Sequence, residues 1–391
     1  MKYIVGKSTL ASITAKALGW EVLDTDAILE TRYQMPVQKF ILTRGYDSLR
    51  MAESEILINV LRNNPSEKVI ACGSRTIELE ENRTALRKFR ERSLVIHVIR
   101  DKNAITAYVQ QSAVQNKNTD EWERLVKLFR ECCSFEFASL TVKVPQDREV
   151  VLPETGTNEL SVIFKPVEKD FFRLLRFIHG VDTNKVPTRQ RSYFLPLTYN
   201  DLNKALPHLD ELSIGLDLWG IRGDLLASYD PSYLSFQVAT LRRHSTLPVI
   251  FTIRTKSTMG IYPDVEADNT ALQESLISFC QHALRLGIEY VELQFEFPRS
   301  VIDSVVSMKG NSSIIATFFD KKDVCRWEGP ESKQVYDKIV DMGADAAIMV
   351  FHAKSFEDNM SLQTFTSSVS SGPIPLVAIN LGVEVSLKFS R

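Results

Sequence analysis

The sequence lacks the features of a secreted, membrane-spanning or nucleic-acid-binding chain. Only five of its 391 residues are cysteine, an odd and scattered set without C-x-x-C spacing. Such usage is typical of reduced thiols in the cytoplasm or nucleus, and it indicates neither a disulfide framework nor a zinc site. No apolar run reaches the roughly 18 residues of a membrane helix, and the first residues do not resemble a signal peptide. The formal net charge is only −2, so the sequence predicts no direct nucleic-acid contact and no membrane surface.

The alternation of strand and helix signals predicts an α/β protein of two domains joined by a linker. The predicted boundaries are residues 1–145 for the first domain, 146–190 for the linker and 191–391 for the second domain. In the first domain, a helical pattern at Lys7–Leu18 and others like it separate short apolar strands, which favours a parallel sheet. The linker is rich in proline and charge, and a small helix is expected there at 170–179.

The second domain carries seven strand signals separated by helical patterns, as in a (β/α)8 barrel that is one strand short. The fifth and sixth are near-continuous apolar runs, which suits strands covered on both faces. Barrel enzymes place their chemistry at the C-terminal ends of such strands, yet these two strands carry apolar residues there. The predicted strands are 193–197, 211–219, 247–254, 290–297, 312–319, 345–352 and 375–380.

A short motif near the N-terminus matches the second half of a phosphate-binding loop. In G-x-x-x-x-G-K-[ST], backbone N–H groups surround the phosphates, the lysine contacts them and the hydroxyl binds Mg²⁺. The first glycine of the motif would fall on Met1, so the surrounding segment is missing. The favoured interpretation is a helix N-terminus that no longer holds nucleotide, with ATP and Mg²⁺ binding as the alternative. The matching residues are Gly6, Lys7, Ser8 and Thr9.

Four segments, at 6–9, 22–26, 44–50 and 70–73, follow the order and spacing of shikimate kinase. The chain resembles the kinase segment of the pentafunctional AROM protein of fungi. The resemblance implies a P-loop kinase-like fold in which a shikimate-type polyol acid is held by several side chains and a glycine turn. An ordinary surface ion cluster is the alternative. The matching residues are Asp24, Asp26, Arg50 and Gly73.

The same resemblance implies that kinase activity is lost. The family clamps the transferring phosphoryl group with an arginine in its lid, but residues 101–123 contain no arginine. Leu125 stands where a further arginine is expected, and Ser74 and Arg75 replace two of three turn glycines. No nucleotide cofactor and no metal are therefore expected.

Residues 193–391 resemble type I 3-dehydroquinate dehydratase in three signatures, at 247–257, 355–359 and 378–382. In that family a lysine forms a Schiff base with the substrate ketone, and a histidine transfers protons. Aligned through the surrounding motifs, the histidine falls on Phe319 and the lysine on Ile348, and neither side chain can do this chemistry. Arg254 matches the arginine that binds the substrate carboxylate, with a structural ion pair as the alternative. Further family residues fall on Ser213 and Gly215 (the second-strand Glu and Arg) and on Phe389 (a late arginine).

Together the two halves are similar to the fungal quinate repressor proteins, which resemble AROM domains with degraded active sites. This resemblance implies a catalytically inactive regulator in the cytoplasm or nucleus. It would sense quinate, shikimate or 3-dehydroquinate and act by contact with a transcriptional activator protein. A surviving shikimate-pathway enzyme, with dehydratase and kinase-like activity, is the alternative. A decayed chain that binds no ligand is a third.

Overall fold

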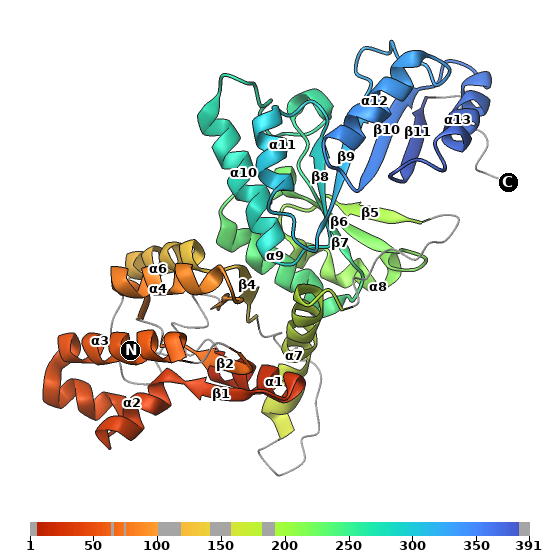
Figure 1. The fold of residues 1–391 in the computed structure, drawn as a ribbon. Coiled ribbons are helices and arrows are strands. Elements are labelled where there is room, and N and C mark those ends of the chain that lie inside the picture. Colours follow the sequence, from red (N-terminus) through yellow and green to blue (C-terminus); the bar gives the residue numbers. More distant parts are fainter. Residues whose placement is uncertain are drawn as a thin grey trace. The chain divides into compact units, whose positions relative to one another are not determined.

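The structure, a computed structural model, describes residues 6–63, 66–73, 76–100, 119–140, 158–181 and 192–382. The chain divides into two compact units, Met1–His179 and Gly180–Arg391. Figure 1 shows the first unit in red to olive and the second in green to blue.

In the described part of the first unit, the sheets are two separate pairs of parallel strands. β1 (Glu21–Asp24) pairs with β2 (Lys68–Ala71), and β3 (Ile96–Ile99) pairs with β4 (Phe135–Ala138). Parallel pairing with helices between the strands is the arrangement that the alternating signals predict. The helices are α1 (Lys7–Leu18), α2 (Thr25–Tyr33), α3 (Val37–Asn63), α4 (Glu80–Arg90), α6 (Thr119–Cys132) and α7 (Asn158–Ile178), with a 3₁₀ turn η1 at Thr76–Glu78.

Local signals set the helix boundaries around β1. α1 ends where Gly19 takes the left-handed backbone conformation, with φ at 70°. α2 is capped at its N-terminus by Asp24, whose carboxylate accepts the backbone N–H of Asp26 at 2.9 Å. This N-cap places the carboxylates of Asp24 and Asp26 at the C-terminal end of β1.

Helix α7 lies in the stretch that the sequence predicts to be a linker, and it is longer than the small helix expected there. Its Phe171 and Leu174 are buried in one hydrophobic cluster with Leu10 of α1. The helix contains Pro166, which removes one backbone donor, and the buried apolar face compensates for that loss. The described part of the stretch therefore packs with the first unit, whose boundary falls at His179.

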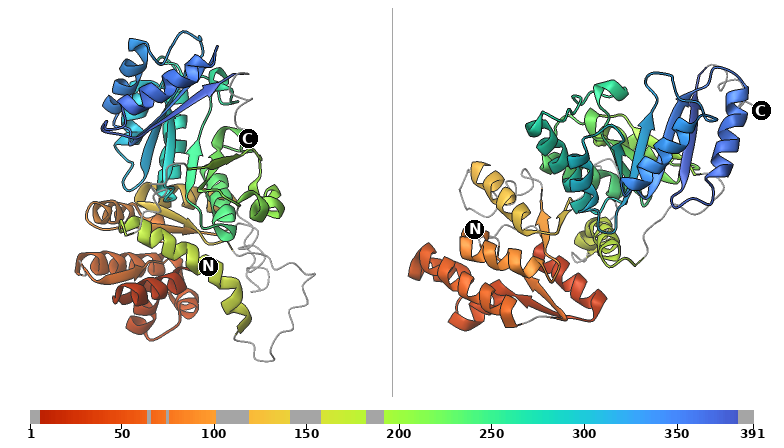
Figure 2. Two further views of the ribbon diagram at one scale, coloured as in Figure 1. Left: turned by 90° about the vertical axis from the view of Figure 1, so that its right-hand side faces the viewer. Right: turned by 45° about the horizontal axis from the view of Figure 1, so that its top comes forward.

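One seven-stranded parallel sheet forms the second unit, and the strands follow one another in chain order (Figure 2). Among the described residues, the edge strands β5 and β11 each pair on one side only. The predicted incomplete (β/α)8 architecture is thereby confirmed as a half-barrel. The strands are β5 (Phe194–Leu197), β6 (Leu218–Arg222), β7 (Val249–Thr252), β8 (Tyr290–Gln294), β9 (Ser313–Phe319), β10 (Ala346–His352) and β11 (Leu376–Leu381).

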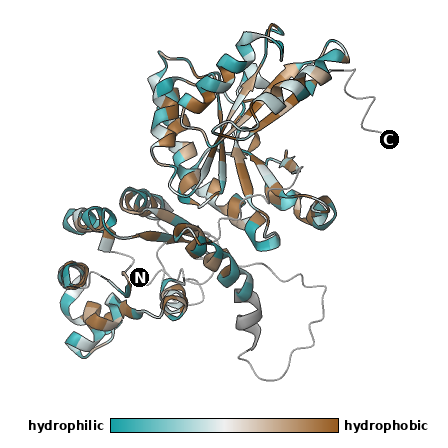
Figure 3. Ribbon diagram, turned by 45° about the vertical axis from the view of Figure 1, so that its right-hand side comes forward, coloured by the Kyte–Doolittle hydropathy of each residue, from teal (hydrophilic) through white to brown (hydrophobic). Residues whose placement is uncertain are grey.

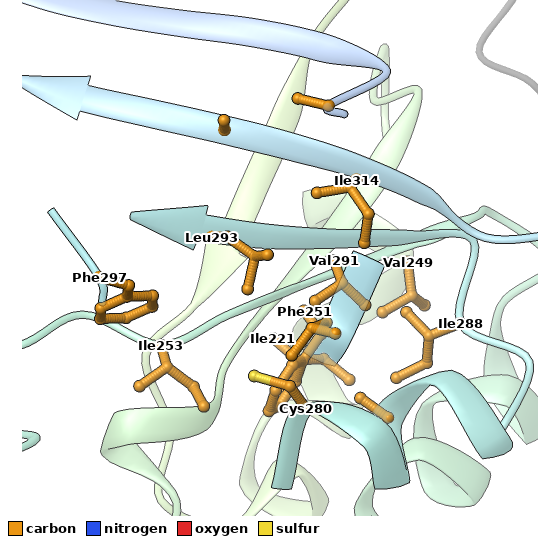
Figure 4. Close-up of a cluster of buried hydrophobic side chains, with 14 of the residues drawn as sticks. Ile221, Val249, Phe251, Ile253, Cys280, Ile288, Val291, Leu293, Phe297 and Ile314 are labelled. Carbon is orange, nitrogen blue, oxygen red and sulfur yellow. The ribbon is translucent and has the colours of Figure 1, made fainter. Parts of the chain in front are cut away.

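The main hydrophobic core lies between this sheet and its helices, as the cluster in Figure 4 shows. Within it, Phe251 of β7 packs edge-to-face on Phe279 of α10, with ring centroids 5.3 Å apart. The strands are mostly hydrophobic and the outer surfaces of the helices hydrophilic (Figure 3). The helices are α8 (Leu209–Leu212), α9 (Pro231–His244), α10 (Thr270–Arg285), α11 (Arg299–Val306), α12 (Pro330–Asp341) and α13 (Glu357–Ser368).

The second strand of the sheet departs from the prediction. The pattern predicts it at 211–219, whereas β6 spans Leu218–Arg222 and α8 occupies Leu209–Leu212. A left-handed turn at Gly215, with φ at 75°, separates the two elements. Ile214 is 82 % exposed, so the apolar pattern there does not mark a buried strand. The prediction was wrong because it treated an exposed apolar residue as part of the core.

Candidate functional site

The half-barrel sheet has an inner face opposite its helices. Side chains alternate between the two faces of a strand, and Trp219, Phe251 and Leu293 belong to the core shared with the helices. Their neighbours along the strands therefore lie on the inner face. Those of the central strands are Gly220 and Arg222 on β6, Ile250 and Thr252 on β7, Glu292 and Gln294 on β8, Ile315, Thr317 and Phe319 on β9, and Ile348, Val350 and His352 on β10.

Asp224 anchors the residues that follow β6 and β7. Its carboxylate is fully buried and accepts two guanidinium N–H groups of Arg222, at 2.8 and 2.7 Å. It also accepts the backbone N–H groups of Arg254 and Ile261, each at 3.3 Å. The bidentate pair neutralises Arg222, and the backbone contacts fix the main chain at Arg254.

The side chain of Arg254 stands apart from this pairing. It is half-buried, and among the described residues its guanidinium has no hydrogen-bond or ion-pair partner. A Cβ on Gly260 would lie 1.9 Å from the Arg254 carbonyl oxygen, so only glycine lets the loop pass this close. The structural ion pair considered as an alternative role is not formed within the described part of the chain. A half-buried, unpaired guanidinium suits an anionic ligand.

Lys321 connects the loops that follow β7, β8 and β9. Its ammonium donates to Ser257 Oγ at 2.8 Å and lies 3.8 Å from the carboxylate of Glu296. Burial raises the pKa of Glu296, an effect that a backbone hydrogen bond and the Lys321 charge only partly offset. Both partners of the Lys321 amine are loop residues beyond the strand ends. None of the seven strands itself contains a lysine.

In the first unit, carboxylates neutralise the lysine of the phosphate-loop motif. Lys7 Nζ lies 3.2 Å from Asp26 Oδ2 and 3.7 Å from Asp24 Oδ1. Ser8 Oγ donates to Asp24 Oδ2 at 2.7 Å. Burial alone would raise the pKa of Asp24, but the Ser8 hydrogen bond and the Lys7 charge hold it below its usual value. The remaining motif residues are Gly6, the left-handed cap of α1, and Thr9, which is exposed.

The residues expected to hold a polyol acid are brought together in part. Gly73 follows β2 beside Asp26, since a Cβ on Gly73 would lie 3.1 Å from Asp26 Oδ1. Arg50 of α3 instead forms an ion pair with Glu78 of η1 at 2.6 Å. Asp24, Asp26 and Gly73 thus share one edge of the sheet. The Arg50 guanidinium, by contrast, is already paired with the Glu78 carboxylate.

Leu125 of α6 is a core residue. It is 4 % exposed and belongs to a hydrophobic cluster with Leu57 and Ile77, so it offers nothing to a phosphate. Among the described residues, no group of three His, Cys, Asp or Glu could hold a metal, and no helix has the length and apolar character to cross a membrane. The predictions for Met1, Ser74, Arg75, residues 101–118 and Phe389 concern positions outside the described residues, as do residues 146–157 and 182–190 of the predicted linker.

Comparison with known proteins assigns both units. Residues 193–384 match the family of type I 3-dehydroquinase, and residues 4–155 match shikimate kinase. The protein therefore pairs a shikimate kinase-like domain with a type I dehydroquinase-like domain.

These two domains are homologous to segments of the AROM polypeptide. The chain is 29 % identical over 389 residues to the pentafunctional AROM polypeptide of Scheffersomyces stipitis, covering 98 % of this chain. It is 30 % identical over 387 residues to that of Candida glabrata, covering 97 % of this chain. The chain spans about a quarter of these relatives, 23 % of each. A solved structure, dehydroquinate dehydratase and shikimate dehydrogenase from S. pombe AroM, is similar over 51 % of this chain and 38 % of that one, with 28 % identity and a TM-score of 0.47.

In the dehydroquinase-like domain, both aligned catalytic positions face the inner side and are apolar. Ile348 of β10 is 6 % exposed and lies opposite Thr317 of β9. Phe319, at the end of β9, packs edge-to-face on His352, with ring centroids 5.7 Å apart and planes at 87°. Neither Phe319 nor Ile348 can attack a carbonyl or carry a proton.

Arg222 is a residue of this face that the sequence alignment missed. The ungapped alignment puts the family's second-strand Glu and Arg on Ser213 and Gly215, but both precede β6. On β6 itself, Gly220 and Arg222 have the same two-residue spacing. A Cβ on Gly220 would lie 2.9 Å from the Pro196 Cα, so no side chain fits there without movement. β6 therefore offers one charged side chain to the inner face, that of Arg222, and the buried apolar run before it was the signal that could have located this residue.

Proposed function

We propose that this protein is a catalytically inactive regulator of quinate or shikimate metabolism. Its dehydroquinase-like domain binds a small polyol acid such as quinate, shikimate or 3-dehydroquinate and does not convert it. A transcriptional activator protein, contacted in the cytoplasm or nucleus, responds to the occupied form.

The observation that carries the proposal is Ile348 in the place of the Schiff-base lysine. A Schiff base needs a neutral amine inside the pocket, and the seven strands offer none. Phe319 removes the proton carrier as well. Lys321 does not replace the lost amine, because Ser257 and Glu296 engage it beyond the strand ends.

Arg254 supports retained binding. Its guanidinium has no partner among the described residues, whereas Arg222 beside it is paired bidentately with Asp224. Asp224 holds the main chain of Arg254 in place before any ligand arrives. A preorganised arginine of this kind suits the planar carboxylate of a polyol acid.

The shikimate kinase-like domain supports the inactive part of the proposal. Asp24 and Asp26 already neutralise Lys7, and Leu125 is buried in the core. Without free positive charge at these positions, a transferring phosphoryl group lacks stabilisation. The regulator accordingly uses no nucleotide.

Titration calorimetry of the full chain with quinate, shikimate and 3-dehydroquinate tests the proposal. We expect binding without consumption of 3-dehydroquinate. Arg254→Ala should weaken binding by about tenfold to a hundredfold, because hydrogen bonds to charged groups are worth about 1.5–3 kcal/mol. Arg299→Ala is the matched control, since this arginine is 58 % exposed on α11 and paired with Asp303.

Two results would overturn the proposal. Absence of heat with every acid at millimolar concentration would remove the ligand-binding role. Consumption of 3-dehydroquinate, with a borohydride-trapped adduct on any lysine, would establish the surviving enzyme instead. The regulatory part of the proposal is tested by measuring the affinity of the purified chain for the activator protein with and without quinate. An affinity that quinate does not change would refute the regulatory role.

A further inference from the structure

Two buried polar atoms on the inner face of the half-barrel have no hydrogen-bond partner among the described residues. They are Oγ1 of Thr317 on β9 and Nδ1 of His352 on β10. The Thr317 residue is 8 % exposed, and the His352 ring is held edge-to-face against Phe319. Buried polar atoms in folded proteins are nearly always hydrogen-bonded, so two such atoms on one face need an explanation.

Other polar groups on the same face are satisfied. Thr252 donates to Glu292 at 2.7 Å. The side-chain amide of Gln294 donates two hydrogen bonds, at 2.9 and 2.8 Å. The two unpartnered atoms lie on the adjacent strands β9 and β10, and Thr317 lies opposite Ile348, the position of the lost lysine. The unused capacity of Thr317 therefore lies beside Ile348, and that of His352 lies beside Phe319.

We propose that Thr317 and His352 hydrogen-bond the ring hydroxyls of a polyol acid whose carboxylate binds Arg254. This inference rests on the proposed function and adds the two residues that select a hydroxylated acid. A threonine hydroxyl donates or accepts, and an imidazole nitrogen does either according to its tautomer, so both fit a hydroxyl group. Ile348, opposite Thr317, gives the ring an apolar surface to lie against.

The strand order makes this arrangement reachable by one small ligand. β7, which leads to Arg254, lies two positions from β9 in the sheet, about 10 Å at the usual strand spacing. An extended arginine side chain and a six-membered ring together span that distance. β10 is the next strand, and His352 lies four residues beyond Ile348, about 13 Å along the strand, past the paired residues Phe319 and Val350. The ring would therefore meet Thr317 at one edge and His352 at the opposite edge.

The experiment compares ligand affinity with the stability of the unliganded protein. In Thr317→Val the quinate Kd should rise by about threefold to tenfold, which corresponds to one neutral hydrogen bond. The urea midpoint without ligand should stay the same or increase, because the substitution removes a buried hydroxyl that has no partner. If the threonine were merely structural, the substitution would lower the urea midpoint as well as weaken quinate binding. Thr317→Ser, which keeps the hydroxyl, should retain most of the affinity.

His352→Phe should behave like Thr317→Val, and the matched controls are Thr364→Val and His208→Phe at exposed positions. Cyclohexanecarboxylate, which has the carboxylate and no hydroxyl, should bind the unmodified protein weakly and lose nothing further in either variant. Unchanged quinate affinity in both variants, alongside weaker binding by Arg254→Ala, would overturn this inference and leave the proposed function standing. Absence of quinate binding by the unmodified protein would overturn both.

Discussion

Restoring the lost amine tests the geometry of the proposed site most directly. Ile348→Lys would place an amine on the inner face of β10, opposite Thr317, at a position that is only 6 % exposed. Burial disfavours the charged form, so the pKa of the introduced lysine should fall from about 10.4 to about 7 or 8. At pH 7 this shift raises the neutral, nucleophilic fraction from below about 0.1 % to about 10–50 %.

The same burial lowers stability by an amount that the protein should tolerate. Replacing a buried isoleucine side chain by a polar amine costs about 3 kcal/mol. For a domain of about 200 residues this lowers the Tm by about 6–12 °C. Val377→Lys is the matched control, because Val377 lies opposite Ile348 on β11 but is 48 % exposed. Its amine should stay protonated and unreactive.

The assay is incubation with 3-dehydroquinate, reduction with borohydride and mass analysis of the peptides. We expect an adduct on the introduced lysine of Ile348→Lys, and none in the unmodified protein or in Val377→Lys. Adding Phe319→His to the same chain should supply a proton carrier and permit slow turnover. An Ile348→Lys protein that folds and binds 3-dehydroquinate but yields no adduct would refute the claim that position 348 faces the ligand.

Three further expectations concern the rest of the chain. Asp224→Asn should reduce the free energy of unfolding of the half-barrel by about 3 kcal/mol, because Arg222 is left half-buried without its carboxylate; a loss below about 1 kcal/mol in urea would contradict the anchoring role. The pKa of Asp24 is lowered on folding, so its stabilisation is present above the unfolded pKa of about 3.9 and is lost as the pH falls through the folded pKa. Urea midpoints of the unmodified protein should therefore fall more steeply in acid than those of Asp24→Asn, and parallel slopes would exclude this contribution. Burial raises the pKa of Cys280 to about 12, so iodoacetamide at about pH 8 should not label this thiol before unfolding; labelling of Cys280 in the native protein would contradict its burial.

The strands of the half-barrel could be predicted wherever an apolar run is buried on both faces. β9 and β10 were found in this way, because their side chains meet the helix core on one side and the inner face on the other. β6 was misplaced because Leu212 and Ile214 extend the apolar pattern although both are exposed. A sequence pattern records which side chains are apolar, and only packing decides which of them are buried.

The assignment of Phe319 and Ile348 to the family's histidine and lysine positions stays a prediction from motif spacing. The pairings of the candidate site could not be predicted from the sequence. Whether Arg254 is free depends on Asp224, 30 positions earlier, whose carboxylate binds the side chain of Arg222 and only the backbone of Arg254. Which of the two arginine side chains pairs with Asp224 is decided by the three-dimensional structure. The spacing of the motif does not indicate it.

The single-sided pairing of β5 and β11 bears on how long a ligand would stay bound. Within the described residues no strand bridges these two, so the described strands leave the inner face open between them. If the proposed ligand binds this face, an open side would let the ligand leave without a loop movement, and we expect a short residence time. In the proposed sensor role, occupancy would then follow the rise and fall of the metabolite.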